Sequence, residues 1–599
     1  MNQLLRVLAL GCVFLFAVGA AFAQNSAGSL SGSVSDANGG AVANAKITAK
    51  QDSTGRIFST VATSEGLYAF SNLDVGTYTL MVEANGFKKL SRSNVIIAIS
   101  NRTVADVKLE VGDVSQTVQI TADAPLLQTA TTDVGVNFSP KMFKDAPISA
   151  GGIRSPEAFI GFQPSVTYGA GSEGSIAGGA RRSKEILIDG ANATNPESGG
   201  VFFNGYPSVE SVGEFKLIQN TFAAEYGRTG GGIESFVTAS GGNQFHGNVF
   251  DYHTSSALSA APWASKAATV GTTPFRKLPY HGNEYGFAIG GPIFTPKKYL
   301  GPLGGYNSDK TKTFFFFTLD NFRRTDSSSR FITLPTAKMR TGDFSELLTA
   351  SPARIIYDPL TGQPFANNII PQARFSSVSK NILPLLPAVT TAGIVSNYLA
   401  TTTTKSKQDS WSLKINHNFT SKHLLNAYFS KQSLGAVTDG PLPDPLLGAG
   451  ANFFAPNKPI FARFNYDWIL SPTLNLHVTY GITRLRSYFE NQSVGKGWPQ
   501  KLGLKGVTQT VTDAFPVVNF TTNGYQNLAD TNGTKTNGSQ FNYTDHFRAD
   551  LSWVKGNFNW KFGVDHRWMR TTGEKLPSGA FDDAGVQGVF NFSNLQTAN

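Results

Sequence analysis

One spacing of histidine and glutamate in the sequence could hold a metal ion. His281 and Glu284 form an H-x-x-E pair, which supplies two zinc ligands in some metallopeptidases. A catalytic zinc needs three protein ligands, and no convincing third ligand accompanies the pair. The pair also falls where a strand is expected to begin. We therefore interpret it as coincidence and assign no catalytic or metal-binding residue.

Other patterns that support chemistry are equally weak. The sequence contains neither a G-x-S-x-G nucleophile motif nor a G-x-x-x-x-G-K-[ST] phosphate loop. Asp320 and the pair Asp582-Asp583 suit solvated loops as readily as calcium, which needs six or more converging oxygens. The only cysteine, Cys12, lies in the N-terminal apolar run. We expect no enzymatic activity and no cofactor.

The overall composition favours a β-rich chain of several domains. The 599 residues include 61 glycines and 45 phenylalanines but only 5 methionines, and 15% of the residues are charged. Many turns and aromatic residues with few charges are typical of all-β proteins. The formal charge is +10, but the basic residues are scattered. A nucleic-acid-binding surface would need them clustered, so we expect no nucleic-acid partner.

The first 23 residues have the pattern of a secretory signal peptide. Arg6 supplies the positive charge, Val7 to Phe22 form the apolar region, and an A-x-A cleavage site follows at 21–23. A retained helix and a lipoprotein cysteine at Cys12 are the weaker alternatives. No later run is long and apolar enough for a spanning helix. If the chain crosses a membrane, it must do so as a closed β-barrel.

Residues 28–111 alternate apolar and polar side chains in short segments. Val42 to Lys50, Thr77 to Glu83 and Arg102 to Leu109 are examples, and turn residues separate them. About seven short strands at this spacing predict a β-sandwich. A sandwich fold identifies no function by itself. We favour a spacer role over a ligand-binding role.

Longer alternating segments follow residue 244. They place aromatic and aliphatic residues on one face and polar residues on the other, with examples at 411–419, 463–468, 474–482, 546–553 and 558–565. Short turns at 420–422, 471–473 and 554–556 alternate with long loops at about 323–408, 431–459 and 485–542. Transmembrane barrels combine this period of two with short periplasmic turns and long extracellular loops. The sequence therefore predicts antiparallel transmembrane strands.

Several phrases give these elements a family resemblance. The phrases are ILIDGAN, PSVESVGEFKLIQN, AEYGRTGGG and GGNQFHGNVF between residues 186 and 250, and LPTAKMRTGDFSELL and IIYDPLTGQPFANNIIPQARF in the longest loop. They resemble TonB-dependent outer-membrane receptors, and the Oar-like group most closely. Residues 28–111 look like the carboxypeptidase regulatory-like domain, a carbohydrate-binding-like sandwich.

The resemblance implies a mainly β architecture with four parts after the signal peptide. It implies a sandwich at 28–111, a linker at 112–130, a small α+β plug at 131–240 and a barrel at 241–599. About ten strands are expected after residue 244, whereas plugged transporter barrels have about 22. We therefore expect a partial barrel and a chain cut short within it.

The resemblance also implies candidate functional residues. A TonB box, the extended peptide that TonB pairs with by β-augmentation, is expected at Gln116, Thr117, Val118, Gln119, Ile120, Thr121 and Ala122. The same segment fits the last strand of the sandwich equally well. Candidates for plug–barrel ion pairs are Arg181, Arg182, Glu225 and Arg228, with solvated charge as the alternative. Loop aromatics that could stack on a ligand are Phe202, Phe203, Tyr206 and Trp263, although simple packing is favoured.

The implied function is energised uptake of an unidentified ligand, such as a siderophore or a carbohydrate. The implied partners are TonB with its inner-membrane energising complex, outer-membrane lipid, and a small ligand or glycan. An adhesion or envelope-structural barrel without active transport is the alternative. A periplasmic metallopeptidase is a third hypothesis, which depends on the H-x-x-E pair alone.

Overall fold

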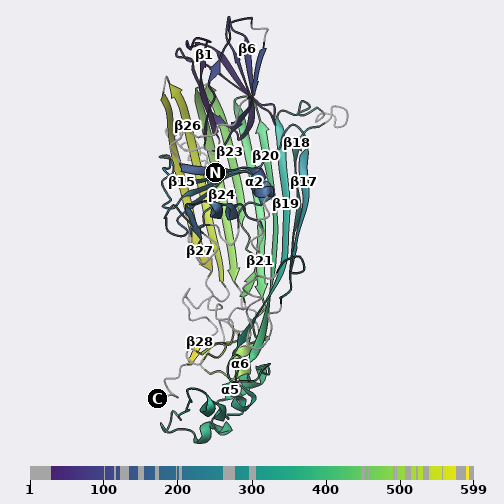
Figure 1. Cartoon of the computed structure of the whole chain (residues 1–599), viewed down its shortest axis with the longest axis vertical. Helices are drawn as coiled ribbons and strands as arrows, with labels where there is room; N and C mark the ends of the chain where they lie inside the picture. The colour runs from purple at the N-terminus through teal and green to yellow at the C-terminus, as the bar shows by residue number, and fades with distance from the viewer. Residues whose placement is uncertain are drawn as a thin grey trace, which may run out of the picture.

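The computed structural model shows three folded parts along one long axis (Figure 1). It describes residues 28–99, 101–113, 117–121, 134–145, 154–168, 174–196, 199–200, 205–260, 277–295, 305–446, 452–455, 457–471, 473–489, 493, 496–505, 514–520, 524–529, 538–555, 558–574 and 589–592. The N-terminal run, Phe202, Phe203, Trp263 and Asp582-Asp583 lie outside these ranges.

The N-terminal part is a β-sandwich of two small sheets. Its strands are β1 (Gly28–Ser35), β2 (Lys46–Gln51), β3 (Ile57–Val61), β4 (Leu67–Leu73), β5 (Gly76–Glu83), β6 (Lys89–Ile97), β7 (Arg102–Val104), β8 (Val107–Lys108) and β9 (Thr117–Thr121). One sheet has the order β4-β1-β7, with β8 also on β1, and the other β3-β2-β5-β6-β9. Alternate residues of each strand point between the sheets, where Leu30, Tyr78 and Leu80 are fully buried.

The candidate TonB box overlaps the last of these strands. Residues 117–121 form β9, which pairs in parallel with β6 and is an edge of its sheet. Gln116 and Ala122 lie outside the described residues. Gln119 and Ile120 are exposed. The segment is therefore a sandwich strand in this structure, and its other edge faces away from β6.

The segment predicted to be a plug, which we call the plug below, is built on a five-stranded sheet of order β10-β15-β16-β13-β14. Its elements are β10 (Val134–Phe138), α2 (Pro140–Asp145), η2 (Pro156–Phe162), β11 (Val166–Tyr168), β12 (Gly174–Ile176), β13 (Glu185–Ile188), β14 (Ala191–Asn192), η4 (Val209–Ser211), β15 (Val212–Asn220) and β16 (Ile233–Thr238). Phe215 stacks on Phe138 and Phe236, with ring centroids 5.0 and 4.4 Å apart. The plug therefore has its own apolar core.

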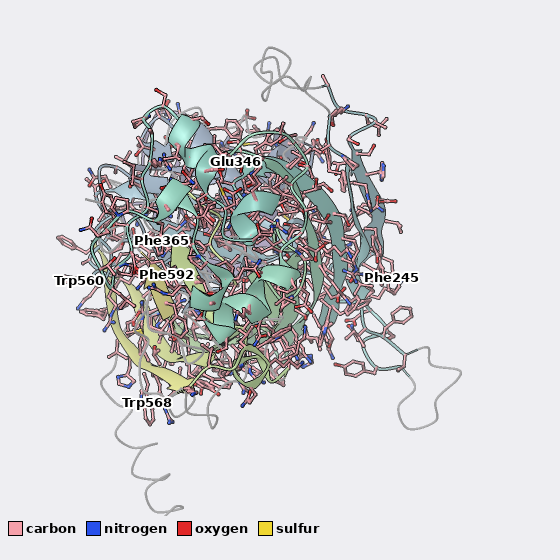
Figure 2. All side chains as sticks on the ribbon, turned by 90° about the horizontal axis from the view of Figure 1, so that it is seen from below. Phe245, Glu346, Phe365, Trp560, Trp568 and Phe592 are labelled. Atoms are coloured by element: carbon pink, nitrogen blue, oxygen red, sulfur yellow. The ribbon has the colours of Figure 1, made fainter. Side chains whose placement is uncertain are left out.

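Ten antiparallel strands form one large sheet that curves around the plug (Figures 1 and 2). They are β17 (His246–Ser255), β18 (Tyr280–Pro292), β19 (Thr313–Ile332), β20 (Tyr398–Asn418), β21 (His423–Thr438), β22 (Asn452–Ala455), β23 (Ile460–Ser471), β24 (Leu474–Phe489), β26 (Gly538–Lys555) and β27 (Phe558–Glu574). Among the described residues, β17 and β27 are the two open edges. The predicted fold class, with a partial barrel, is confirmed.

Several barrel strands are longer than the sequence pattern suggested. β21 continues to Thr438, β24 continues to Phe489 and β26 begins at Gly538, all within the loops expected at about 431–459 and 485–542. β19 and β20 are extended most. The loop expected at about 323–408 is reduced to 333–397, because β19 continues to Ile332 and β20 begins at Tyr398. The extra segments carry serine and threonine instead of alternating apolar residues. Ser328 and Thr402 bond across the strands at 2.6 Å, and Ser329 and Thr401 at 3.0 Å. Backbone pairing thus continues where the apolar alternation stops.

The long loops pack together at the end of the sheet remote from the sandwich (Figure 1). They contain α4 (Ala337–Arg340), η6 (Ser345–Thr349), η7 (Ala366–Asn368), η8 (Gln372–Arg374), α5 (Ser377–Ile382), η9 (Leu383–Leu385), α6 (Trp498–Leu502), β25 (Val517–Phe520) and β28 (Val589–Phe592). Leu334, Leu446 and Phe515, from three different loops, share one apolar core. None of the described helices has both the length and the apolarity needed to cross a bilayer.

Candidate functional site

The inner face of the curved sheet is polar and carries most of the contacts with the plug. Residues that alternate with the outward apolar positions point inward and are buried: Arg463, Asn465, Asp467, His477, Thr479, His546, Arg548 and Asp550. Arg463 and Arg548 are among the largest fully buried side chains of the described chain. Buried charges need partners, because removing an ion from water costs several kcal/mol. The plug supplies many of these partners.

Arg154 of the plug is the centre of the first cluster. Its side-chain Nε donates to Glu284 of β18 at 2.9 Å, and its backbone N–H donates to the other oxygen of the same carboxylate at 2.9 Å. Its Nη2 donates to Glu210 at 3.2 Å, and Lys144 contacts that carboxylate at 3.1 Å. The guanidinium also lies 3.9 Å from the ring centre of Tyr252. These contacts join the plug to the first two barrel strands.

This cluster explains the H-x-x-E pair. His281 and Glu284 lie three residues apart on β18, and neighbouring strand residues point to opposite faces. Glu284 faces the lumen and is buried, whereas His281 is exposed. The two side chains cannot bind the same metal ion. No group of three potential metal ligands occurs among the described residues.

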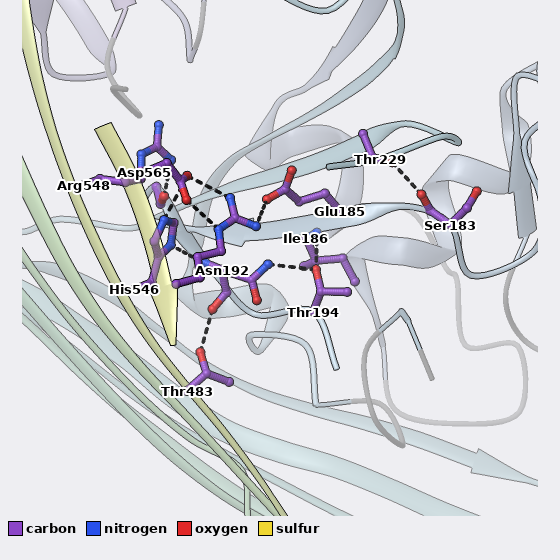
Figure 3. A network of polar contacts seen from close by, with 12 residues as sticks. Ser183, Glu185, Ile186, Asn192, Thr194, Thr229, Thr483, His546, Arg548 and Asp565 are labelled. Carbon is purple, nitrogen blue, oxygen red and sulfur yellow. Dashed lines mark hydrogen bonds and ion pairs between the residues drawn. The ribbon is translucent and has the colours of Figure 1, made fainter. Parts of the chain in front are cut away.

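The turn between β13 and β14 is the centre of the second cluster. Arg463 of β23 donates to the carbonyls of Ile188 and Asn192, at 3.1 and 3.2 Å. Arg548 of β26 donates to the carbonyl of Gly190. Figure 3 shows the neighbouring contacts, including Thr483, which donates to the Asn192 carbonyl at 2.6 Å. Two barrel arginines thus hold backbone carbonyls at the tip of the plug sheet.

A third cluster connects the last barrel strand to the plug. Arg567 of β27 contacts Glu185 of β13 at 2.5 Å and Asp565 at 2.8 Å. Asp565 also lies 3.0 Å from His546, whose other ring nitrogen accepts the backbone N–H of Asn192 at 2.9 Å. The chain of contacts therefore runs from β13 through β27 and β26 back to β14 (Figure 3).

The plug also contains one charged cluster of its own. Lys184 contacts both Glu157 and Glu234, the latter at 2.8 Å, and donates to the Tyr206 hydroxyl at 3.1 Å. Burial lowers the pKa of Lys184, but the charges of Glu234 and Glu157 outweigh it and raise the pKa above its ordinary value. The lysine therefore stays charged and holds two buried carboxylates within the plug.

The four residues predicted to join plug and barrel differ in position. Glu225 contacts Lys561 of β27 at 2.8 Å. Arg181, Arg182 and Arg228 are exposed. Most of the connection is made by residues that we did not assign to it, namely Arg154, Glu185, Glu284 and Arg567. Arg463 and Arg548 did lie on the predicted polar face of the strands.

Of the four loop aromatics, only Tyr206 lies in the described chain. Its side chain is buried, and its ring centre lies 5.8 Å from that of Phe236 in the plug core. Its carbonyl accepts a hydrogen bond from Gln432 of β21 at 2.8 Å. Tyr206 therefore packs inside the plug, and its ring is not free to stack on a ligand.

The sandwich closes the other side of the plug. The Glu214 carboxylate of β15 accepts the backbone N–H of Ile99, which follows β6, at 3.0 Å and Asn137 at 3.1 Å. Burial raises the pKa of Glu214 to about 7. A cavity of about 550 Å³ lies beside this contact and is lined by all three parts of the chain. Its walls include Gln51 of the sandwich and Lys414 of the barrel.

Comparison with known proteins agrees with this architecture. Residues 237–599 match the family model described as outer membrane beta barrel domain, and residues 29–110 match the carboxypeptidase regulatory-like domain. The TonB-dependent transporter Oar of Myxococcus xanthus is 28% identical over 320 residues, which are 52% of this chain and 29% of that protein. The chain thus spans less than a third of this relative.

Two solved structures are similar in part. The outer membrane transporter YddB from Escherichia coli has a TM-score of 0.43 and 11% identity, covering 71% of this chain and 47% of that one. The siderophore receptor PirA from Acinetobacter baumannii has a TM-score of 0.38 and 12% identity, covering 73% and 47%. The outer membrane β-barrel family model matches more than half of this chain, so the chain belongs to that family. The expected resemblance to Oar-like receptors is also confirmed.

Proposed function

We propose that this chain works as a TonB-dependent outer-membrane transporter in which pulling on the linker displaces the plug. The observation that carries the proposal is the nature of the plug–barrel interface. Most of its contacts are hydrogen bonds and ion pairs, such as Arg154 with Glu284 and Arg463 with two carbonyls. Water can replace such contacts when the plug moves, whereas a continuous apolar interface would oppose hydration.

The orientation of the sheet supports this direction of transport. Short turns join β20 to β21 and β23 to β24 at the end that contacts the sandwich, where Ile469 packs against the sandwich core. Outer-membrane barrels have their short turns in the periplasm and their long loops outside the cell. The sandwich is then periplasmic, where TonB can reach it. The ligand would enter past the packed loops at the opposite end.

The edge strand β9 is the proposed contact for TonB. An unpaired strand edge presents a row of free N–H and C=O groups, to which another chain can add a strand. Among the described residues β9 pairs only with β6, and Gln119 is exposed. In this proposal TonB pairs with β9 either in place or after β9 leaves β6.

A pull on β9 would reach the plug through an edge strand of the plug sheet. The chain leads from β9 to β10, which has five residues and is an edge of the plug sheet. β10 pairs only with β15 among the described residues. Detaching it would expose Phe138 and the stacked ring of Phe215. The plug core would therefore open from this edge, while β13 and β14 remain held by barrel arginines.

Site-directed cross-linking tests this proposal. The only cysteine of the chain is Cys12, so a single cysteine introduced in a mature chain beginning after residue 23 gives an unambiguous product. Gln119→Cys on β9 is compared with Ser59→Cys on β3, the opposite edge of the same sheet. Each variant is mixed with a TonB C-terminal domain that carries cysteines along its exposed strand.

We expect disulfide formation with Gln119→Cys and none with Ser59→Cys. Replacing residues 117–121 by a glycine–serine segment of equal length should remove TonB binding while the barrel still inserts into membranes. Equal cross-linking at both edges, or binding that survives the replacement, would refute the contact. Absence of any interaction with TonB would favour an adhesion or envelope-structural role.

A further inference from the structure

The outward face of the sheet carries a group of arginines among aromatic rings. Arg484 and Arg486 lie on β24 and Arg570 on β27, and we call these three residues the arginine cluster. Phe541 and Tyr543 of β26 lie between them. All of these positions alternate with lumen-facing residues, so they point away from the plug.

Strand register brings the cluster together. Tyr543 pairs directly with Arg484 on one side and with Arg570 on the other. The guanidinium of Arg484 lies 5.3 Å from the ring centre of Tyr543, and that of Arg486 lies 5.0 Å from Phe541. A surface cavity of about 550 Å³ is lined by Arg484, Tyr543 and Arg570, together with Phe541, Asp545, Trp568 and Thr572. Aromatic walls thus surround a hollow with arginines on both sides.

The height of the cluster can be estimated from the register. A second row, formed by Leu474, Trp553 and Trp560, lies ten residues closer to the periplasmic turns on each strand. Ten residues at about 3.3 Å, on strands tilted by about 40°, rise about 25 Å, which is the usual height of the lipid-facing band. With the tryptophans at the periplasmic interface, Arg484 and Arg570 reach the outer one.

A view along the long axis (Figure 2) shows that tryptophans near the cluster point outward. Figure 2 shows Trp560 and Trp568 pointing away from the molecule, and 70% of the Trp568 side chain is exposed. Tryptophans at these levels are typical of the aromatic girdles that border the apolar band. The hollow beside Trp568 therefore faces the lipid headgroups of the outer leaflet.

The charges of the cluster have no acidic partners among the described residues. Elsewhere on the outward face, Arg323 and Lys407 both contact Asp409, the latter at 3.2 Å. In contrast, no ion pair given for the described chain includes a residue of the cluster. The one carboxylate in the hollow, Asp545, accepts a hydrogen bond from Tyr480 at 3.3 Å. Two guanidiniums and one carboxylate thus line the hollow, and the third guanidinium lies beside it against Phe541, which leaves an excess of positive charge.

We propose that the arginine cluster binds the phosphate groups of a phosphorylated glycolipid in the outer leaflet. Guanidinium groups bind phosphate through paired hydrogen bonds, and low polarity nearby strengthens the contact. The aromatic rings would contact the sugar and the first acyl carbons, which lie directly beneath the phosphates. This site is on the outer surface of the barrel, so it does not depend on transport or on TonB.

Vesicle binding by the full mature chain tests the site. The chain in detergent is titrated with phosphatidylcholine vesicles that contain a diphosphorylated glucosamine-disaccharide lipid, its dephosphorylated form, or phosphatidylglycerol. The test variant is Arg484→Gln/Arg486→Gln/Arg570→Gln. Lys405→Gln, which removes an exposed charge from the outward face of β20, is the matched control. Strand content by circular dichroism shows that each variant is folded.

One basic residue near a membrane surface contributes about a fivefold gain in affinity, so three should contribute about a hundredfold. We expect the triple variant to lose about this much affinity for the diphosphorylated lipid, and Lys405→Gln to lose little. Equal binding by the original chain and the triple variant would overturn the proposal. An equal loss on phosphatidylglycerol vesicles would also overturn it, because it would show general charge attraction without a phosphate site.

Discussion

Protonation of Glu214 should control how firmly the sandwich closes the plug. Its carboxylate accepts the Ile99 N–H across the sandwich–plug contact, at 3.0 Å. Burial raises the pKa of Glu214 to about 7, although the bonds from Ile99 and Asn137 and the charge of Lys216 lower it in part. If the sandwich leaves, water reaches the carboxyl group and its pKa falls towards the ordinary value of 4.5.

The sign of the effect follows from linkage. The docked state binds the Glu214 proton more tightly than the undocked state. The extra docking free energy that this proton provides is therefore complete below about pH 4.5 and is lost as the pH rises to about 7. The difference between these pKa values corresponds to at most about 3 kcal/mol, at 1.36 kcal/mol for a tenfold change. Glu214→Gln keeps an oxygen for the Ile99 N–H and carries no charge, so it should behave like the protonated form.

Hydrogen exchange of the Ile99 amide measures the docking equilibrium, because its protection reports the free energy of local opening. After correction for intrinsic exchange, protection in the original chain should fall by up to about a hundredfold between about pH 5 and about pH 8. Glu214→Gln should abolish this fall. Glu110→Gln, at an exposed sandwich residue, should retain it. The reasoning is refuted if Glu214→Gln keeps the original pH dependence.

Two further changes test the plug–barrel contacts. Arg154→Met leaves the buried Glu284 carboxylate without its guanidinium partner and should destabilise plug docking by about 3–5 kcal/mol, measured by hydrogen exchange of β15. Adding Glu284→Gln should recover part of that loss, and strictly additive effects would show that the pair is not coupled. A Cβ at Gly481 would lie 2.3 Å from the Cβ of Ala191, so Gly481→Ala should displace the plug and increase its cleavage by protease. Gly227→Ala, where a Cβ meets nothing within 4 Å, is the control, and equal cleavage of both variants would contradict the close contact.

The barrel strands could be predicted from sequence because each residue there has a local reason for its polarity. An outward side chain meets lipid and an inward one meets the plug or water, so the period of two appears in the sequence itself. The prediction failed at the ends of β19 and β20, where serine and threonine replace the alternating apolar residues. There the pairing is maintained by the backbone and by hydroxyl pairs such as Ser328 with Thr402.

The plug–barrel contacts could not be predicted in the same way. Arg154 and Glu284 are 130 residues apart, and Arg548 and Gly190 are 358 apart. Such pairs depend on the strand register and on the rotation of the plug inside the sheet, which no local pattern contains. A better signal was present in the strands, since Arg463 and Arg548 occupy inward positions where a buried charge requires a partner.

The β9 segment shows a different limit of sequence patterns. Alternation in Val118 and Ile120 is required of a sandwich strand, but an extended peptide waiting to pair with another protein has the same pattern. The structure pairs β9 with β6, and this pairing is compatible with either role because an edge strand keeps one side unpaired.

The distribution of apolar and polar contacts suggests why a plug can be stable and still leave its place. Within the plug, stacked rings such as Phe215 and Phe236 form a core that does not need the barrel. Against the barrel, the apolar contacts are few, with Tyr428, Phe461 and Leu485 joining the plug core. The remaining contacts are polar, and a buried ion pair contributes little net stability because desolvation offsets its attraction. Such an interface fixes the position of the plug with many directional bonds, and in the proposed mechanism its free energy of separation would stay small enough for a pull through β10 to overcome.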